Sequence, residues 1–389
     1  MAEPVSVAWV NLTNGGMSGG FRKYNENILP RLAADPRFTR LSVHSPADMP
    51  DVTVPPNCDE YRWPTHEFLR GFPTLRRQIA ARRPTIVYVP MHRYVNTNGI
   101  PLIVMYRNME AATQPWGENG IAEALKNVAR RIDARRAMRR AAGVIAVSQF
   151  VADFLRDEWH IDPGKTRLIY HGVAEDHVEP RRPAAVPADV PFIFTAGSIR
   201  PFRGLEDLIE GAALLPEALR HYRVVIGGRL EGRVRAYYNR LLERSRELGV
   251  NDRIIWAGML QQDEMVWCFR NCMAFAMTSR VEACPNTALE AMNQGAACVA
   301  TTNPPMPEFF GDTAKYYPAG DGGALARSLG ELVADREARV RLQEAGRERM
   351  RRFTWRDTYD RTADFLLEIA RQSRGALAPN TSATSAVAG

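Results

Sequence analysis

The chain has 389 residues and a formal net charge of +7, with 45% hydrophobic and 24% charged residues. This length suggests two to three domains, and the composition excludes a disordered chain, a fibrous repeat and a small disulfide scaffold. The longest apolar runs fall far short of the ~20 residues that a membrane-spanning helix needs. The start, MAEPVSVAWV, lacks the basic stretch of a signal peptide. We therefore expect a cytoplasmic protein whose five cysteines are reduced thiols.

In the first half of the chain, short β-rich runs alternate with longer helical stretches. The predicted strands are Val5–Leu12, Arg40–His44, Thr85–Pro90, Pro101–Tyr106, Val144–Ser148 and Arg167–His171. The predicted helices include Phe21–Ala34, Gly120–Ala142 and Gln149–Trp159. A proline-rich passage follows, Glu179–Pro191, which we interpret as an interdomain linker kept out of both cores.

After this passage the alternation restarts. The predicted strands are Phe192–Ala196, Arg223–Gly227, Arg253–Gly258, Ala274–Thr278 and Ala297–Thr301. The predicted helices are Leu205–Ala218, Val234–Leu248, Asp263–Asn271, Thr287–Asn293, Gly323–Ala334, Glu337–Arg352 and Trp355–Gln372. Such alternation is typical of parallel sheets covered on both faces.

The sequence therefore predicts an α/β protein with two doubly wound, Rossmann-like domains that face each other across a cleft. The domains are expected at residues 1–178 and 191–354. A C-terminal helix over 355–372 could return to the first domain, and the tail 373–389 is expected to be disordered. Ligands of such sheets bind at the carboxyl ends of the strands, so the cleft is the expected site.

In each domain, one glycine-containing turn follows the first predicted strand. Gly15 and Gly16 belong to a four-glycine turn that would let backbone N–H groups approach an anion at a helix N-terminus. The alternative is a flexible surface turn. In the second domain, Arg200 and Arg203 follow Gly197 and could neutralise a diphosphate. The alternative is a solvated arginine pair.

Two glutamates stand eight residues apart in the segment Ser279–Glu290. Pro285 suits a first helical turn, so Glu282 would lie in the preceding loop and Glu290 inside the helix. Free N–H groups around Asn286 and Thr287 would point into the cleft. Each carboxylate could accept hydrogen bonds from hydroxyl groups of a sugar or a ribose. The alternative is a capping carboxylate beside a surface glutamate.

This segment also carries a family resemblance. The stretch EACPNTALEAMNQGAACVA resembles the E-x7-E signature of the retaining glycosyltransferase family 4, which has the GT-B fold. Further matches stand in the family's order along the chain: AVSQF, LIYHGV, the turn 197–204, MPE at 306–308, and FTW near the C-terminus. The resemblance is strong in the second half of the chain and weaker in the first. The resemblance implies an acceptor domain in the first half and a nucleotide-sugar donor domain in the second.

The roles that the resemblance implies are specific. Glu282 would bind the donor sugar near the reacting centre, and Glu290 the ribose. Arg203, with Arg200 close by, would hold the diphosphate. The other donor contacts that the resemblance implies are Gly15, Gly16, Gly197, Met259, Cys284, Pro285, Asn286 and Thr287. Neither a metal nor another cofactor is expected, because the chain has no D-x-D motif and its arginines would supply the positive charge.

The chain departs from the family pattern at one place that bears on the acceptor. Many relatives carry histidine after the fourth strand, whereas Arg107 and Asn108 stand here as candidates for sugar or acceptor contacts. The expected acceptor is a glycan, a lipid-linked molecule or a small molecule. Nucleic acid is not an expected partner, because no recognition module is present.

A run of six arginines lies in the segment 127–142. It would either be the solvated face of a helix or dock on anionic lipid, giving peripheral contact at the inner face of a membrane. Two alternative functions stay open for this chain: a sugar phosphorylase or epimerase built on the same scaffold, and a two-lobed sugar-binding protein.

Overall fold

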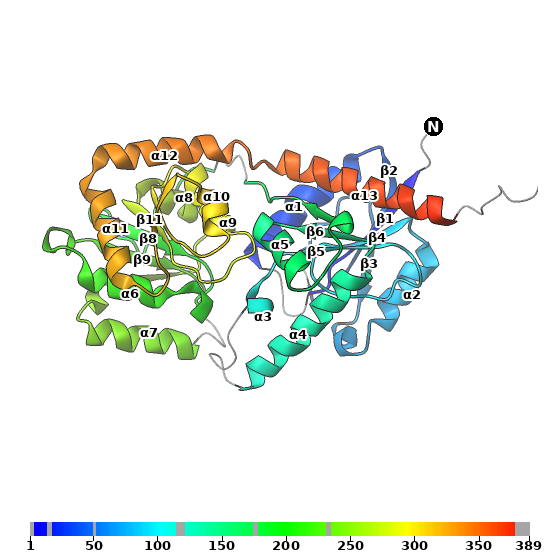
Figure 1. Ribbon diagram of the computed structural model, residues 1–389, viewed down its shortest axis with the longest axis horizontal. Coiled ribbons are helices and arrows are strands. Elements are labelled where there is room, and N and C mark those ends of the chain that lie inside the picture. The colour runs from blue at the N-terminus through cyan, green and yellow to red at the C-terminus, as the bar shows by residue number, and fades with distance from the viewer. Residues whose placement is uncertain are drawn as a thin grey trace, which may run out of the picture.

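The computed structural model describes residues 4–13, 18–49, 52–113, 121–173, 178–230 and 235–377. Two lobes lie side by side, and each contains a parallel β-sheet with helices packed against it (Figure 1). The chain fills the N-terminal lobe first, then crosses once to the C-terminal lobe and finally returns. The predicted α/β class with two doubly wound sheets is therefore confirmed.

In the N-terminal lobe, the described residues form seven parallel strands in the order β3-β2-β1-β4-β5-β6-β7. The strands are β1 (Val5–Val10), β2 (Phe38–Pro46), β3 (Asp59–Trp63), β4 (Ile86–Val89), β5 (Leu102–Tyr106), β6 (Gly143–Ala146) and β7 (Thr166–Leu168). The helices are α1 (Gly19–Ala34), α2 (Pro73–Arg82), α3 (Glu110–Thr113), α4 (Ile121–Arg140) and α5 (Gln149–Asp157). The strand order reverses between β1 and β4, and such a switch point is where ligands of these sheets bind.

In the C-terminal lobe, the described residues form six parallel strands in the order β10-β9-β8-β11-β12-β13. The strands are β8 (Phe192–Ala196), β9 (Arg223–Gly227), β10 (Ile254–Gly258), β11 (Ala274–Met277), β12 (Cys298–Thr301) and β13 (Ala314–Tyr317). The helices are α6 (Leu205–Leu214), α7 (Arg235–Glu247), α8 (Gln262–Asn271), α9 (Asn286–Asn293), α10 (Met306–Phe310), α11 (Gly322–Ala334) and α12 (Arg336–Met350). The switch point of this sheet lies between β8 and β11.

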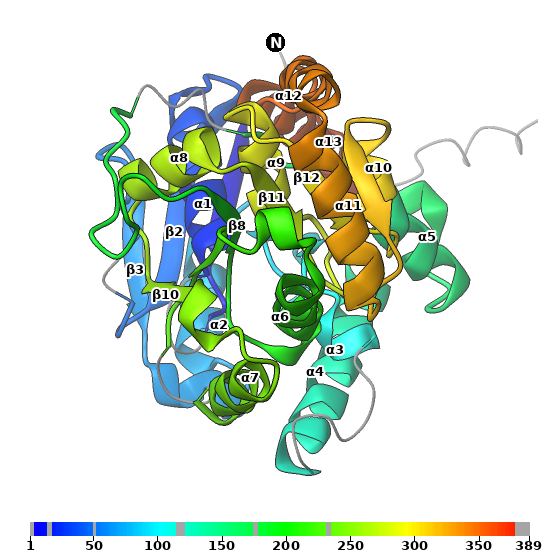
Figure 2. The same ribbon diagram turned by 90° about the vertical axis from the view of Figure 1, so that its left-hand side faces the viewer.

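Figure 2 shows the C-terminal lobe end-on, with helices on both faces of its sheet. Neighbouring residues of β8 pack against helices on opposite faces of this sheet. Phe194 of β8 stacks edge-on against Phe269 of α8, with ring centroids 5.3 Å apart. Its neighbour Ile193 belongs to a second apolar cluster, which also contains Leu208 of α6 and Leu329 of α11. Burial on both faces explains why four of the five residues of β8 are apolar.

The two strands that sequence analysis missed, β3 and β13, are edge strands. β3 reads DEYRW and β13 reads AKYY, so neither has the continuous apolar run of a central strand. An edge strand is covered less completely, and its charged side chains discourage pairing with another chain. Helix α2 was also missed; its sequence, PTLRRQIAAR, is rich in arginine.

The proline-rich passage is not kept out of the core, which corrects the prediction. Val186 is buried in the apolar cluster that includes β8 and α8. Arg181 also binds α8, with its Nε 2.7 Å from Asp263 Oδ2 and its backbone N–H donating to the Asp263 carbonyl. The passage therefore packs as part of the C-terminal lobe.

Helix α13 (Trp355–Leu377) leaves the C-terminal lobe and packs on α1 of the N-terminal lobe (Figure 1). Arg37 Nη1 bonds Asp364 Oδ1 at 2.8 Å, and Tyr359 bonds Asp35. The helix includes residues 373–377, where a disordered tail was predicted. Arg374 holds this end by donating to the carbonyl of Pro4 at 2.7 Å. The rest of the predicted tail lies outside the described residues.

Candidate functional site

A pocket opens at the carboxyl ends of β8, β9 and β11, at the switch point of the C-terminal sheet. It is lined by Gly197, Ser198, Arg203, Gly227, Thr278 and Ser279, among other residues. The lining joins two turns that sequence analysis selected separately, the one after β8 and the one after β11. A ligand here would meet the guanidinium of Arg203.

The first turn needs glycine because Arg203 folds back over it. Gly197 has φ +144°, and a Cβ atom there would lie 1.8 Å from Arg203 Nη2. Gly204 has φ +59°, and a Cβ atom there would lie 2.4 Å from the carbonyl oxygen of Thr278. The Thr278 hydroxyl in turn donates to the Arg203 carbonyl at 2.6 Å. Glycine at both positions therefore lets the Arg203 side chain lie in the pocket.

Arg203 is held by the second turn, the loop between β11 and α9. Its Nη1 donates to Glu282 Oε1 at 2.8 Å and to Ser279 Oγ at 2.9 Å. Only 14% of the Arg203 side chain and 17% of the Glu282 side chain are exposed. Burial raises the pKa of the Glu282 carboxyl, against the lowering effect of Arg203 and Ser279. The structure thus brings together two of the predicted site residues.

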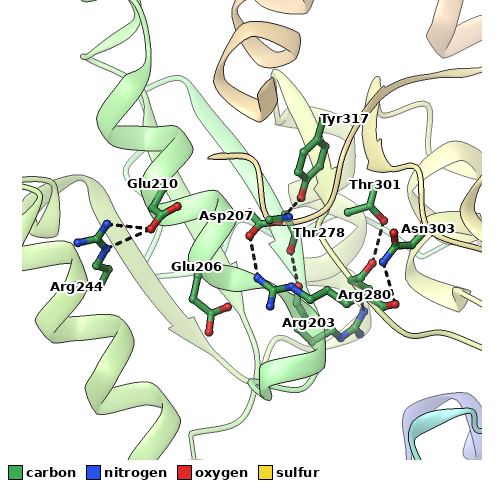
Figure 3. Close-up of polar contacts among 12 residues, drawn as sticks. Arg203, Glu206, Asp207, Glu210, Arg244, Thr278, Arg280, Thr301, Asn303 and Tyr317 are labelled. Carbon is green, nitrogen blue, oxygen red and sulfur yellow. Dashed lines mark hydrogen bonds and ion pairs between the residues drawn. The ribbon is translucent and has the colours of Figure 1, made fainter. Parts of the chain in front are cut away.

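The loop that carries Glu282 is fixed by a second arginine, drawn in Figure 3. Arg280 Nη2 lies 3.1 Å from Oδ1 of the buried Asp207, on α6. The backbone N–H of Arg280 donates to the Phe202 carbonyl at 2.7 Å, and Asn303 donates to the Arg280 carbonyl at 3.1 Å. Tyr317 also donates to Asp207 at 3.2 Å. Because Asp207 is buried and accepts hydrogen bonds from both Arg280 and Tyr317, these contacts fix the geometry of the loop.

Helix α9 begins at Asn286, directly after Pro285, at the interface between the lobes. Asn286 Oδ1 lies 3.4 Å from His171 Nδ1 of the N-terminal lobe and 3.5 Å from Cys284 Sγ. The Thr287 hydroxyl lies 3.9 Å from Met277 Sδ, at the end of β11. One turn further along, Glu290 Oε1 binds Lys23 Nζ at 2.6 Å. The N-terminus of α9 therefore faces α1, the first helix of the other lobe.

The other predicted residues lie around this centre. Arg200 does not join Arg203: its Nη1 lies 3.1 Å from Glu110 Oε1, on α3 of the N-terminal lobe. Asn108 is exposed, and its Oδ1 accepts the backbone N–H of Glu110 at 2.8 Å. Met259, after β10, is 58% exposed, and Arg229 Nη2 lies 3.1 Å from its sulfur.

Arg107 follows β5 and packs on α1. Its Cζ lies 5.0 Å from the centroid of the Phe21 ring and 5.7 Å from that of Tyr24. Burial lowers the pKa of Arg107 to about 10, so it remains a cation at neutral pH. The predicted contacts Gly15 and Gly16 lie outside the described residues. In the part of the chain that the structure describes, no three His, Cys, Asp or Glu side chains gather as metal ligands would.

Sequence analysis missed Lys23, Glu110 and Ser279. Lys23 and Glu110 belong to the N-terminal lobe and meet their partners only across the interface. Ser279 lies in the quoted segment, but its hydroxyl gains a role only when the first turn places Arg203 beside it. These residues depend on tertiary structure, and the order of residues along the chain carries no comparable signal for them.

Two protein-family models match the chain. The model of glycosyl transferases group 1 matches residues 178–349, and the model of glycosyltransferase family 4 matches residues 28–177. The two matches meet where the chain passes from one lobe to the other.

Curated relatives are similar over part of their length. The lipopolysaccharide core biosynthesis glycosyltransferase LpsE of Rhizobium meliloti is 32% identical over 42% of this chain and 45% of its own. A D-inositol 3-phosphate glycosyltransferase of Saccharomonospora viridis is 28% identical over 58% of this chain and 54% of its own. The one from Corynebacterium glutamicum is 24% identical over 71% of each chain. The chain thus spans about half the length of the first two relatives.

Solved structures share the whole architecture. Sucrose-phosphate synthase from Thermosynechococcus elongatus superposes with a TM-score of 0.72 at 18% identity, over 96% of this chain and 99% of that one. Anabaena Alr3699/HepE in complex with UDP and glucose gives 0.72 at 16% identity, over 94% and 100%. These likenesses establish the GT-B fold. Together with the two family models, they show that the chain belongs to the family 4, group 1 glycosyltransferases.

Proposed function

We propose that this protein transfers a sugar from a nucleoside-diphosphate sugar to an acceptor hydroxyl, with retention of anomeric configuration and without a metal ion. The observation that carries the proposal is the contact of Arg203 with Glu282 and Ser279 in a pocket at the strand ends. One guanidinium and one carboxylate stand side by side there, as a ligand with both a phosphate and hydroxyl groups requires.

Arg203 is the group that we assign to the leaving diphosphate. A sugar–phosphate bond breaks readily only if the negative charge that develops on the departing phosphate is stabilised. Arg203 Nε is buried and has no hydrogen-bond partner among the described residues, so it lacks a bond that a phosphate oxygen would supply. The N-terminus of α9 would add its partial positive charge.

The two glutamates would bind the two ends of the donor. Glu282 lies beside Arg203 and would accept hydrogen bonds from hydroxyls of the transferred sugar. Glu290 would accept hydrogen bonds from the ribose, since it lies inside α9, beyond the helix end that faces the diphosphate. Support for a nucleotide donor also comes from Anabaena Alr3699/HepE, whose structure contains UDP and glucose.

The chemical step that we propose needs no covalent enzyme intermediate. The bond between the anomeric carbon and the phosphate oxygen breaks, and a bond from that carbon to the acceptor oxygen forms on the same face. The acceptor proton passes to an oxygen of the departing phosphate. Closely packed lobes would exclude water and so limit hydrolysis of the donor. Retention rests on membership of the family, and metal independence on the placement of Arg203.

Contact with an anionic membrane is part of the proposal, for a lipid-linked acceptor. Helix α4 carries the exposed residues Lys126, Arg131 and Arg139, and two aliphatic residues on it, Leu125 and Ile132, are each 64% exposed. Such a face suits an interfacial helix. No described helix is long and apolar enough to span a bilayer. Co-sedimentation with neutral and anionic vesicles tests this part; equal recovery with both would contradict it.

The experiment that tests the proposed function is a donor screen. The purified protein is incubated with a panel of nucleotide sugars, and release of the nucleoside diphosphate is measured with and without candidate acceptors. We expect slow hydrolysis of one donor and faster release with a matching acceptor. Failure of every donor to react, in protein shown to be folded, would contradict the proposal.

A further inference from the structure

One carboxylate of the C-terminal lobe caps a helix of the N-terminal lobe. Glu308, on α10, accepts the backbone N–H of Gln149 at 2.6 Å through Oε1 and that of Phe150 at 3.0 Å through Oε2. Both donors belong to the first turn of α5, which lies beside α10 (Figure 2). The contact therefore joins the two lobes through main-chain N–H groups of α5.

The N-terminus of α5 needs these two acceptors. The first N–H groups of a helix have no partners within it. In α5 the Ser148 hydroxyl accepts the Val151 N–H at 3.2 Å. The N–H groups of Gln149 and Phe150 remain, and Glu308 supplies an oxygen to each. A carboxylate at this place also meets the partial positive charge of the helix end, and its hydrogen bonds are charge-assisted. Glu308 thus completes the N-terminal cap of a helix in the other lobe.

Glu308 is anchored in its own lobe, next to both crossings of the chain. Arg349 Nη2 donates to the Glu308 carbonyl at 2.8 Å. The ring of Phe309 lies 5.7 Å from that of Tyr170 and 5.8 Å from that of Phe353. Tyr170 precedes the first crossing between the lobes, and Phe353 precedes the return through α13. Burial and a hydrogen bond to Glu308 raise the pKa of Tyr170, so its hydroxyl keeps its proton at neutral pH. The cap therefore lies where a change in the angle between the lobes would begin.

The cap differs from two other contacts between the lobes. The Lys23–Glu290 ion pair covers the position that we assign to the ribose, and Arg200, which binds Glu110, belongs to the turn that enters the pocket. A bound donor would disturb both. Among the described residues, the pocket lining includes neither Glu308 nor any part of α5. The cap can therefore persist while the pocket is filled.

We propose that Glu308 is a positioning residue, which holds the two lobes in the orientation that transfer requires by capping α5. The effect on turnover rests on the proposed function, whereas the hold on the lobes does not. Transfer needs donor and acceptor in one geometry, and a displacement of about 1 Å can lower a rate by about a hundredfold. Loss of the cap should therefore slow transfer. It should not weaken nucleotide binding, because the residues assigned to the nucleotide lie in the C-terminal lobe and opening would take Lys23 away from Glu290.

The test removes the contact from each lobe in turn. Glu308→Gln removes the charge and one of the two acceptors, and its control is Glu344→Gln, which changes an exposed glutamate on α12 of the same lobe. Gln149→Pro removes one of the two N–H donors. Proline suits the first position of a helix, and Ser148 before it is already extended, with φ −156° and ψ 161°. Gln149→Ala is the matched control, because it loses the same side chain and keeps the N–H.

Small-angle X-ray scattering of the full chain measures the radius of gyration without a ligand. Isothermal titration uses whichever of UDP, GDP, ADP or dTDP binds, and single-turnover kinetics uses the donor and acceptor that the donor screen identifies. We expect Glu308→Gln and Gln149→Pro to have a larger radius of gyration, a transfer rate lower by about tenfold or more, and a nucleotide Kd that rises less than about twofold. Both controls should match wild type. The double variant should lose less than the product of the two single losses, because both substitutions break one contact.

A radius of gyration in Glu308→Gln equal to that of wild type would overturn the proposal. Equal transfer rates in Gln149→Pro and Gln149→Ala would also overturn it, and this comparison holds even if Glu308→Gln fails to fold. Nucleotide binding that weakens in step with the rate would indicate damage to the lobe, which contradicts a positioning role. If no nucleotide sugar reacts with wild type, the proposed function fails, and the scattering comparison still decides whether Glu308 holds the lobes.

Discussion

Lys23 Nζ lies 2.6 Å from Glu290 Oε1 and joins α1 of the N-terminal lobe to α9 of the C-terminal lobe. Glu290 is the carboxylate that we assign to the ribose of the donor. The ion pair therefore covers the position that a nucleotide would take. Binding of the nucleotide has to displace Lys23 from Glu290 or share the carboxylate with it.

Replacing Lys23 with methionine should strengthen nucleotide binding several-fold. The substitution frees Glu290 from a competing cation while keeping an unbranched side chain. Isothermal titration with the nucleoside diphosphate that binds best measures the effect, and Arg31→Met, on the exposed side of the same helix, is the matched control. Weaker binding in Lys23→Met would mean that Lys23 contacts the ligand.

Replacing Arg203 with alanine should lower kcat by about 10²- to 10³-fold, the usual effect of removing one donor that stabilises transition-state charge. Donor KM should change much less, because Glu290 and the N-terminus of α9 remain. Single-turnover kinetics separates the two effects. An unchanged rate would remove Arg203 from the mechanism.

Replacing Gly197 with alanine should impair the same step. The new Cβ would meet Arg203 Nη2 at 1.8 Å and push the guanidinium out of its place. Gly249→Ala is the matched control, since Gly249 also has a positive φ, +67°, but a Cβ atom there would meet no atom within 4 Å. Both variants carry backbone strain, and only Gly197→Ala should lose activity to an extent near that of Arg203→Ala. Equal activity of the two variants would contradict this packing argument.

Chelation of metal ions should leave turnover intact. We assign to Arg203 and the N-terminus of α9 the positive charge that a metal ion would otherwise supply. The rate of nucleotide release is compared before and after dialysis against EDTA. Complete loss, restored by magnesium, would overturn the assignment.

The free energy of unfolding should fall as the pH falls from 7.5 to 5. Burial lowers the pKa of His44 to about 4, below its value of about 6.5 in an unfolded chain. Below pH 6.5 the His44 side chain binds a proton in the unfolded chain but stays neutral in the folded protein. His44 therefore lowers the free energy of unfolding by about 2 kcal/mol over this range. His44→Gln should flatten the pH dependence by this amount. Urea unfolding at both pH values measures the difference.

The central strands could be predicted from the sequence, and β8 and β9 have the predicted bounds. Apart from Thr195 and Arg223, their residues are apolar or glycine, which reflects burial on both faces. The edge strands β3 and β13 could not be found in this way, because their charged residues face solvent. Val186 was misplaced because prolines around it suggested a linker, whereas its own side chain is apolar and packs in the core.

In the candidate site, the contact of Arg203 with Glu282 joins two motifs that the sequence had singled out. The partner of Glu290 could not be predicted, because Lys23 precedes it by 267 residues and belongs to the other lobe. The pairing of Arg200 with Glu110 could not be predicted either, because these two residues also belong to different lobes. Local patterns identify the turns and helix ends, and the meeting of two lobes determines which charges neutralise each other.

The central claim is that Arg203, at the strand-end pocket, and Glu290, on α9, bind the same nucleoside diphosphate. The most direct measurement is isothermal titration of UDP, GDP, ADP and dTDP into wild type and Glu290→Ala. We predict that wild type binds at least one of them and that Glu290→Ala weakens this binding about tenfold or more. Absence of binding to wild type, or equal affinity in the variant, would contradict the account.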